Sequence, residues 1–153
     1  MLTAWRIVKA QYQAAAFDGD GARRFGGRWN SRGLPVVYAA ATPALAALEL
    51  LVHLGNSAAL VSYVTIACTF DETLVLRVDR HRLAKDWRSS PAPPELALVG
   101  DAWLKDGTSA VLEVPSAIIP AESNYLLNPR HADFASIDIG RAQPFEFDLR
   151  LLR

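Results

Sequence analysis

The feature that most constrains the fold is the stretch TPALAALELLVHLG, from Thr42 to Gly55, which predicts one helix with a defined start and end. Thr42 is placed to cap the helix, Pro43 suits its first position, and Gly55 follows its last residue. Between these ends only Glu49 and His53 are polar or charged, and their i, i+4 spacing puts them on one side. The prediction is an apolar helix with one narrow polar stripe.

The stripe itself has two interpretations. In the first, Glu49 faces water and the stripe is only solvated surface. In the second, the stripe lines a cleft, where a partly desolvated carboxylate is available to a developing positive charge. The helix alone does not choose between them.

Alternating apolar segments predict strands on both sides of this helix. Strands are expected at residues 2–8, 35–39, 60–70 and 74–78, at one or two places within 109–120, and from 145 onward. The strand at 74–78 is expected to pair with 60–70 through a turn at 71–72. Further helices are expected at 81–90 and 94–105, the latter ending at Gly107, and irregular structure at 12–33 and 122–138. Strands outnumber helices without regular alternation, so the predicted class is α+β, in a single domain over residues 1–153.

Composition argues against several functional classes. The 16 Lys and Arg residues balance 16 Asp and Glu residues, so no net charge draws the protein to nucleic acid, and nucleic-acid cleavage lacks support. No metal-ligand spacing, signal peptide or long apolar run is visible, so we expect no metal, no membrane association and a cytoplasmic location. The lone cysteine, Cys68, is expected to pack as a small hydrophobe.

The glycine-rich segment before the second strand is a candidate binding loop. Gly26 and Gly27 directly precede Arg28, where the backbone could approach a ligand closely and the guanidinium could bind phosphate in a bidentate manner. The competing interpretation is a surface loop with solvated arginines. From the pattern alone, Tyr38 reads as a core residue and Ser116, beside a proline, as a turn residue.

Five motifs taken together resemble the RES-domain toxins: WR at 5–6, GGRWN at 26–30, VVYAA at 36–40, ALEL at 47–50 and VPSAIIPAESNYLLNP at 114–129. That family is named for an arginine, a glutamate and a serine, which would be Arg28, Glu49 and Ser116 here. The resemblance implies a fold similar to ADP-ribosyltransferases, with a central, mostly antiparallel, split sheet flanked by helices.

Members of this family are toxins of bacterial toxin–antitoxin pairs that consume NAD+. The resemblance therefore implies cleavage of the nicotinamide–ribose bond of NAD+, with ADP-ribose passing to water, phosphate or a protein acceptor. It also implies an Xre-type antitoxin partner that occludes the active site, and any contact with DNA would then belong to the antitoxin. The composition also permits a homodimer.

The residue types suit this chemistry. Cleavage develops an oxocarbenium-like charge, which an anion beside the ribose stabilises, and Glu49 is our choice for that anion. Arg28 and Arg6 suit the pyrophosphate. Ser116 could hold a ribose or the nicotinamide amide, and Tyr38 could stack on or cap a ring. The resemblance adds Asn124 as a pocket neighbour, together with Arg6 and Tyr38.

A different class of function remains as the alternative. The chain could be a catalytically silent module that keeps the NAD pocket for partner recognition. The presence of Arg28, Glu49 and Ser116 together argues against that reading, because a silent domain has no physical need for all of them.

Overall fold

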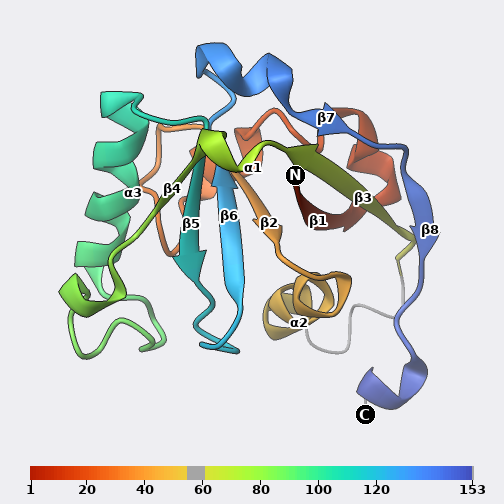
Figure 1. Cartoon of the computed structure of the whole chain (residues 1–153). Coiled ribbons are helices and arrows are strands. Elements are labelled where there is room, and N and C mark those ends of the chain that lie inside the picture. The colour runs from red at the N-terminus through yellow and green to blue at the C-terminus, as the bar shows by residue number, and fades with distance from the viewer. Residues whose placement is uncertain (55–60, 153) are drawn as a thin grey trace.

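The computed structural model describes residues 1–54 and 61–152, which form a curled eight-stranded sheet packed with helices (Figure 1). The strands are β1 (Leu2–Lys9), β2 (Val37–Ala40), β3 (Tyr63–Phe70), β4 (Val75–Arg77), β5 (Val111–Pro115), β6 (Ser123–Leu127), β7 (Asp138–Ile139) and β8 (Gln143–Phe145). The α-helices are α1 (Asp20–Phe25), α2 (Pro43–Leu54) and α3 (Pro94–Asp106). Short 3-10 helices are η1 (Ala10–Ala15), η3 (Glu72–Leu74), η4 (Arg80–Arg82), η5 (Ala132–Ser136) and η6 (Leu149–Leu152). None of the helices within these residues is long and apolar enough to span a membrane.

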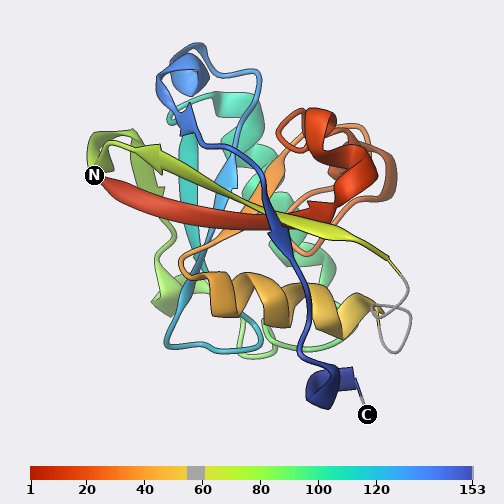
Figure 2. The ribbon, with the colours of Figure 1, turned by 90° about the vertical axis from the view of Figure 1, so that its right-hand side faces the viewer.

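The sheet has the order β4-β5-β6-β2-β1-β3-β7, with β8 also paired to β3. All pairs are antiparallel except β4 with β5. Strands β1 and β3 pair along their whole length, whereas β1 meets β2 only at Trp5 and Ala40. Figure 2 shows β1 and β3 crossing the direction of β5 and β6. The expected α+β fold with a mostly antiparallel, split sheet is therefore confirmed.

Helix α2 lies along one face of the sheet (Figure 2). Its start is as predicted, since the Thr42 hydroxyl accepts a hydrogen bond from the Leu45 amide at 3.1 Å. Leu45 and Ala46 are buried against Ile7 and Ala40, and full burial of a leucine stabilises by about 1.5–3 kcal/mol. The predicted end at Gly55 lies outside the described residues. This packing fixes the position of Glu49, one turn further along the helix.

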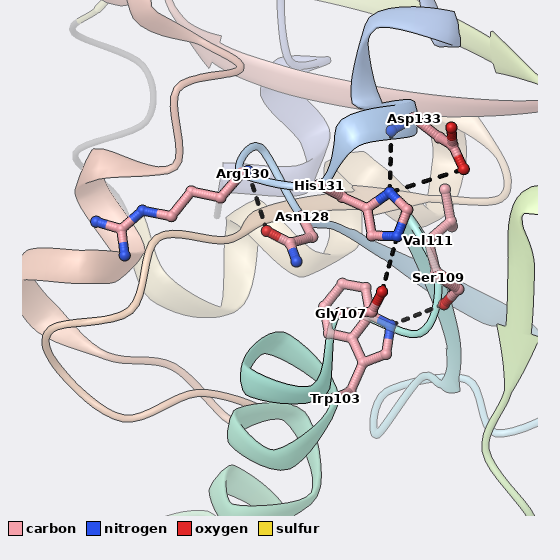
Figure 3. A network of polar contacts seen from close by, with 8 residues as sticks. All are labelled: Trp103, Gly107, Ser109, Val111, Asn128, Arg130, His131 and Asp133. Carbon is pink, nitrogen blue, oxygen red and sulfur yellow. Dashed lines mark hydrogen bonds and ion pairs between the residues drawn. The ribbon is translucent and has the colours of Figure 1, made fainter.

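Helix α3 covers β5 and β6, and its Leu96 and Trp103 are buried in one cluster with Leu112 and Leu126. It ends as predicted, at Gly107 in the left-handed conformation with φ of 62°. His131 joins this end to η5, because its Nε2 bonds the Gly107 carbonyl at 2.9 Å and its Nδ1 accepts from an amide at the start of η5 (Figure 3). The proton of this imidazole therefore lies on Nε2.

The opposite face of the sheet is covered by η1 and η5. Phe70 and Tyr125 meet edge to face there, with ring centroids 5.4 Å apart, and Phe134 of η5 packs against the same cluster. Cys68 is 0% exposed within it, as predicted for a packing residue. Burial raises the pKa of the Cys68 thiol to about 11.

The expected pairing of 74–78 with the strand before it is wrong. Asp71 Oδ1 accepts a hydrogen bond from the Thr73 amide at 2.8 Å and so caps η3 instead of closing a hairpin. The chain then crosses to the far edge of the sheet, where β4 pairs in parallel with β5, Val75 opposite Val111. The Asp71 carboxylate thus stabilises a 3-10 turn at the place where the two-residue hairpin turn was predicted.

Other expectations are also corrected. The segment 122–138 was predicted to be irregular, but it contains β6, an interior strand between β5 and β2. The helix predicted at 81–90 is only η4 followed by turns, and the final strand ends at Phe145 before η6. The segment 12–33 includes the end of η1 and the short helix α1. These elements are short or interrupted by polar residues, so their periodicity was too weak to read.

Candidate active site

Three polar side chains from separate elements meet beside α2. Glu49 Oε1 accepts hydrogen bonds from Ser116 Oγ at 2.8 Å and from Asn124 Nδ2 at 2.7 Å. Ser116 directly follows β5, and Asn124 lies in β6 opposite Val114. The β5–β6 connection runs beside α2 in Figure 1. The structure thus brings together three of the predicted site residues.

Ser116 is oriented by its own turn. Its side chain is fully buried, and its oxygen accepts hydrogen bonds from the amides of Ile118 and Ile119, both at 3.1 Å. With two donors already pointing at this oxygen, the hydroxyl proton is directed to Glu49. Ser116 therefore fixes the carboxylate, and no histidine or lysine side chain hydrogen-bonds its hydroxyl among the described residues.

Asn124 completes this support. A carboxylate only accepts hydrogen bonds, so the amide nitrogen must be the atom that faces Glu49. The other atom of the amide, Oδ1, is buried and has no hydrogen-bond partner within the part of the chain that the structure describes. An unsatisfied buried acceptor costs about 1–3 kcal/mol, and such groups call for a functional explanation.

Glu49 is itself half-buried. Its Oε1 is held by two donors, whereas Oε2 receives no hydrogen bond from residues 1–54 or 61–152. His53, one turn away, is exposed. The arrangement fixes Oε1 and leaves Oε2 without a hydrogen-bond partner among the described residues.

Arg28 lies in a second group of residues. Its Nη1 donates to the carbonyls of Trp87 at 3.0 Å and Ser89 at 2.9 Å. Its Nε and Nη2 have no partner among the described residues. The guanidinium is thus held by one nitrogen, and its other nitrogens remain able to bind an anion.

The loop that carries Arg28 is tied down by Tyr38. The Tyr38 hydroxyl donates to Asn30 Oδ1 at 2.6 Å and accepts from the Trp29 amide at 3.1 Å. A Cβ on Gly27 would lie only 2.7 Å from this hydroxyl oxygen. Burial raises the pKa of Tyr38 above its ordinary value, partly opposed by the Trp29 amide, so the phenol keeps its proton.

Helix α3 holds the same loop from the other side. A Cβ on Gly100 would lie 1.7 Å from the Trp29 carbonyl oxygen, so only glycine permits this approach. The next residue, Asp101, is 6% exposed and accepts a hydrogen bond from the Ser31 amide at 2.8 Å. Sequence reasoning missed both residues. The sequence feature that could have indicated them is a glycine followed by an acidic residue in the middle of an otherwise apolar helix.

Arg6 lies where β1 and β2 separate. Its Nε donates to the Ala16 carbonyl at 2.6 Å and its Nη1 to the Tyr38 carbonyl at 2.8 Å. Burial lowers the pKa of its guanidinium, partly opposed by the Asp18 carboxylate. Among the described residues neither Arg6 nor Arg28 hydrogen-bonds Glu49. Arg6, Arg28 and Tyr38 therefore belong to a different group of hydrogen-bonded residues from Glu49 and its two donors: Arg6 bonds the Tyr38 carbonyl, and the Tyr38 hydroxyl bonds the loop that carries Arg28.

No three His, Cys, Asp or Glu side chains gather in a metal-binding arrangement within the described ranges.

Comparison with known proteins shows the family of this chain. The RES domain family model matches residues 3–148. "Toxin Res" of Yersinia enterocolitica is 38% identical over 149 residues, covering 96% of this chain and 97% of that protein. The "Prs ADP-ribosylating toxin" of a Sphingobium species is 32% identical over 154 residues, covering 97% and 96%.

A solved structure has the same fold. A chain in the crystal structure of the M. tuberculosis MbcT–MbcA toxin–antitoxin complex superposes with a TM-score of 0.76 at 22% identity. The match covers 95% of this chain and 84% of that one. With the family match over residues 3–148 and the relatives of similar length, this chain belongs to the RES domain family.

Proposed function

We propose that this protein is the toxin of a toxin–antitoxin pair and that it cleaves the nicotinamide–ribose bond of NAD+. ADP-ribose then passes to water, phosphate or a protein acceptor, and growth stops until an antitoxin neutralises the enzyme. Membership of the RES domain family supports the proposal, as do relatives that are named toxins. The observation that carries it is the carboxylate of Glu49, which is fixed through Oε1 and receives no hydrogen bond at Oε2 from the described residues.

The chemistry follows from that geometry. As the bond between ribose and nicotinamide breaks, its electron pair leaves with the nicotinamide nitrogen and positive charge develops on the sugar. A fixed carboxylate stabilises this charge more than it stabilises the ground state. Glu49 Oε2 would accept a hydrogen bond from a ribose hydroxyl, while Ser116 and Asn124 keep the carboxylate from rotating. Attack by water, phosphate or a protein nucleophile then completes the transfer, and the acceptor gives up a proton.

The other group of residues would bind the phosphates. Among the described residues, Arg28 has two guanidinium nitrogens without a partner and Arg6 has one, Nη2. Because carbonyl oxygens hold both side chains in place, they would bind a pyrophosphate with little loss of side-chain entropy.

The partner in this proposal is an Xre-type antitoxin that covers the entrance near the arginines with a carboxylate or its C-terminal segment. The family resemblance supports it, and the structure of similar fold is that of a toxin–antitoxin complex. A co-crystal structure of the neutralised pair in which the arginine side chains stay open to solvent would contradict this mode of inhibition.

The acceptor is identified by product analysis. Purified, antitoxin-free protein is incubated with NAD+ alone, with phosphate and with cell lysate, and the products are analysed by mass spectrometry. Free nicotinamide is expected in at least one condition, and the fate of ADP-ribose names the acceptor. The relative named for ADP-ribosylation of Prs makes a modified lysate protein one of the outcomes to examine. Intact NAD+ in every condition would overturn the enzyme proposal in favour of a silent binding module.

A further inference from the structure

The connection between η4 and α3 joins the two groups of site residues. Arg28 Nη1 bonds the carbonyls of Trp87 and Ser89 in this connection. Arg88, the residue between them, donates from Nε to the Ala117 carbonyl at 3.0 Å. Ala117 directly follows Ser116. One three-residue segment, 87–89, therefore contacts both Arg28 and the turn at 116–117 that supports Glu49.

The segment is itself anchored. Trp87 packs against the buried cluster that includes Trp29 and Leu96, beneath the Arg28 loop. The Trp87 amide donates to the Ala84 carbonyl at 3.1 Å and the Ser89 amide to the Asp86 carbonyl at 2.8 Å. These turns hold the backbone of Arg88 in place. The Arg88 side chain can therefore hold the Ala117 carbonyl, and the turn after β5, in a fixed position.

The turn after β5 depends on such contacts for its shape. Its side-chain support comes from Ser116 Oγ, which receives two amides of the turn, and from arginines that reach it from outside. Arg88 bonds the carbonyl next to Ser116, and Arg80 bonds the Pro120 carbonyl at the other end. The direction of the Ser116 hydroxyl, and with it one of the two donors to Glu49, follows from the shape of this turn.

We infer that Arg88 is a positioning residue for the Glu49–Ser116 pair and couples that pair to Arg28. This inference rests on the proposed NAD+ cleavage. Arg88 acts through the Ala117 carbonyl and does not touch the reacting atoms. Without its hydrogen bond the turn relaxes, Ser116 holds Glu49 for a smaller fraction of the time, and the chemical step slows. Substrate binding changes little, because Arg28 keeps both of its carbonyl partners.

The first test compares three single variants in steady-state nicotinamide release. Arg88→Ala is expected to lower kcat by about fivefold to tenfold, the range for loss of one supporting hydrogen bond, with KM changed by less than about twofold. Arg88→Lys keeps a donor that can reach the carbonyl and should recover most of the rate. Arg82→Ala is the matched control. It removes another exposed arginine, six residues earlier at the end of η4, whose ion-pair partner is Asp79 at 3.5 Å, and it should leave both constants within about twofold.

The second test asks whether Arg88 acts through Ser116. Once Ser116→Ala has removed the hydroxyl, adding Arg88→Ala should cost no more than about twofold further, because the two residues act as a unit. Multiplied effects in the double variant, or a rise in KM with unchanged kcat for Arg88→Ala, would overturn the inference and indicate direct substrate contact.

A third measurement needs no catalytic activity. The amides of Ile118 and Ile119 should exchange hydrogen faster in Arg88→Ala than in the wild type, while Arg82→Ala leaves them unchanged. Equal protection in all three proteins would contradict the inference even if NAD+ were not the substrate. If the wild-type protein fails to cleave NAD+ while exchange at these amides still responds to Arg88, the proposed function is wrong but the positioning contact stands.

Discussion

Ser116 Oγ and Glu49 Oε1 lie 2.8 Å apart although 67 positions separate the two residues in the chain. The serine hydroxyl is directed at the carboxylate because two backbone amides occupy its acceptor side. This relationship assigns the serine a supporting role beside the acid, and the predictions below follow from it and from the contacts that hold the Arg28 loop.

Ser116→Ala should reduce both activity and stability. The variant removes a donor from Glu49 and leaves the amides of Ile118 and Ile119 without their acceptor. We expect kcat for nicotinamide release to fall about tenfold or more, and the free energy of unfolding to fall by about 1–3 kcal/mol. Ser136→Ala, at an exposed serine in η5, is the control for stability in a denaturant titration. A Ser116→Ala variant with wild-type kcat would show that Glu49 does not need this donor.

Two glycines near the loop should respond to alanine with opposite signs. At Gly27 the new methyl would meet Tyr38 and Asn30 oxygens at 2.7 and 2.9 Å, so Gly27→Ala should destabilise by about 1–3 kcal/mol. It should also raise KM for NAD+, because Arg28 is the next residue. At Gly21, in α1, nothing lies within 4 Å, so Gly21→Ala should be neutral or stabilise by up to about 1 kcal/mol. Thermal unfolding measures the stability of both variants, and steady-state kinetics measure their KM for NAD+. Equal changes in stability for Gly27→Ala and Gly21→Ala would contradict this account of the loop.

Helix α3 offers a second pair of glycines. Gly100→Ala would push a methyl into the Trp29 carbonyl and should displace the Arg28 loop, with a loss of about 3 kcal/mol or more. Gly107→Ala affects only the left-handed residue at the helix end, at a cost of about 1 kcal/mol. Titration with NAD+ should therefore show weakened binding for the first variant only. Retained affinity in Gly100→Ala would mean that the loop does not depend on α3.

Cys68 should resist alkylation in the native protein. Burial raises its thiol pKa to about 11, so below that pH the folded protein holds the thiol in its unreactive, protonated form, whereas unfolding lowers the pKa toward the ordinary value and exposes the sulfur. Reaction with a chromogenic disulfide at pH 8 should be slow in buffer and complete within minutes in guanidinium chloride. Rapid reaction under native conditions would show that this part of the sheet opens.

Local signals in the sequence were enough for several of these features. Thr42 and Pro43 mark the start of α2, Gly107 marks the end of α3, and the long alternation of β3 is visible without any tertiary information. These features depend on residues close together in the chain, where capping and periodicity act directly.

The remaining features depend on contacts between distant residues. Strand β4 pairs with β5 and not with β3, and no local pattern states which edge a three-residue strand will join. Strand β6 was not predicted because it begins with polar residues. One of them, Asn124, faces Glu49 from a position that would be apolar in an ordinary interior strand. Asp101 and Gly100 hold the Arg28 loop across about 70 residues, a relationship that only the folded chain reveals. The six predicted site residues were chosen from motifs, but their division between two groups of hydrogen-bonded residues could be seen only in the structure.

The most direct test of the account is Glu49→Gln. Glutamine keeps an oxygen that can accept from Ser116 and Asn124, so the local geometry is retained while the negative charge is lost. We predict that kcat for nicotinamide release falls by at least about 100-fold, while the dissociation constant for NAD+ and the midpoint of unfolding change little. A variant that folds, binds NAD+ and retains kcat within about threefold of the wild type would contradict the central claim that the Glu49 carboxylate drives cleavage.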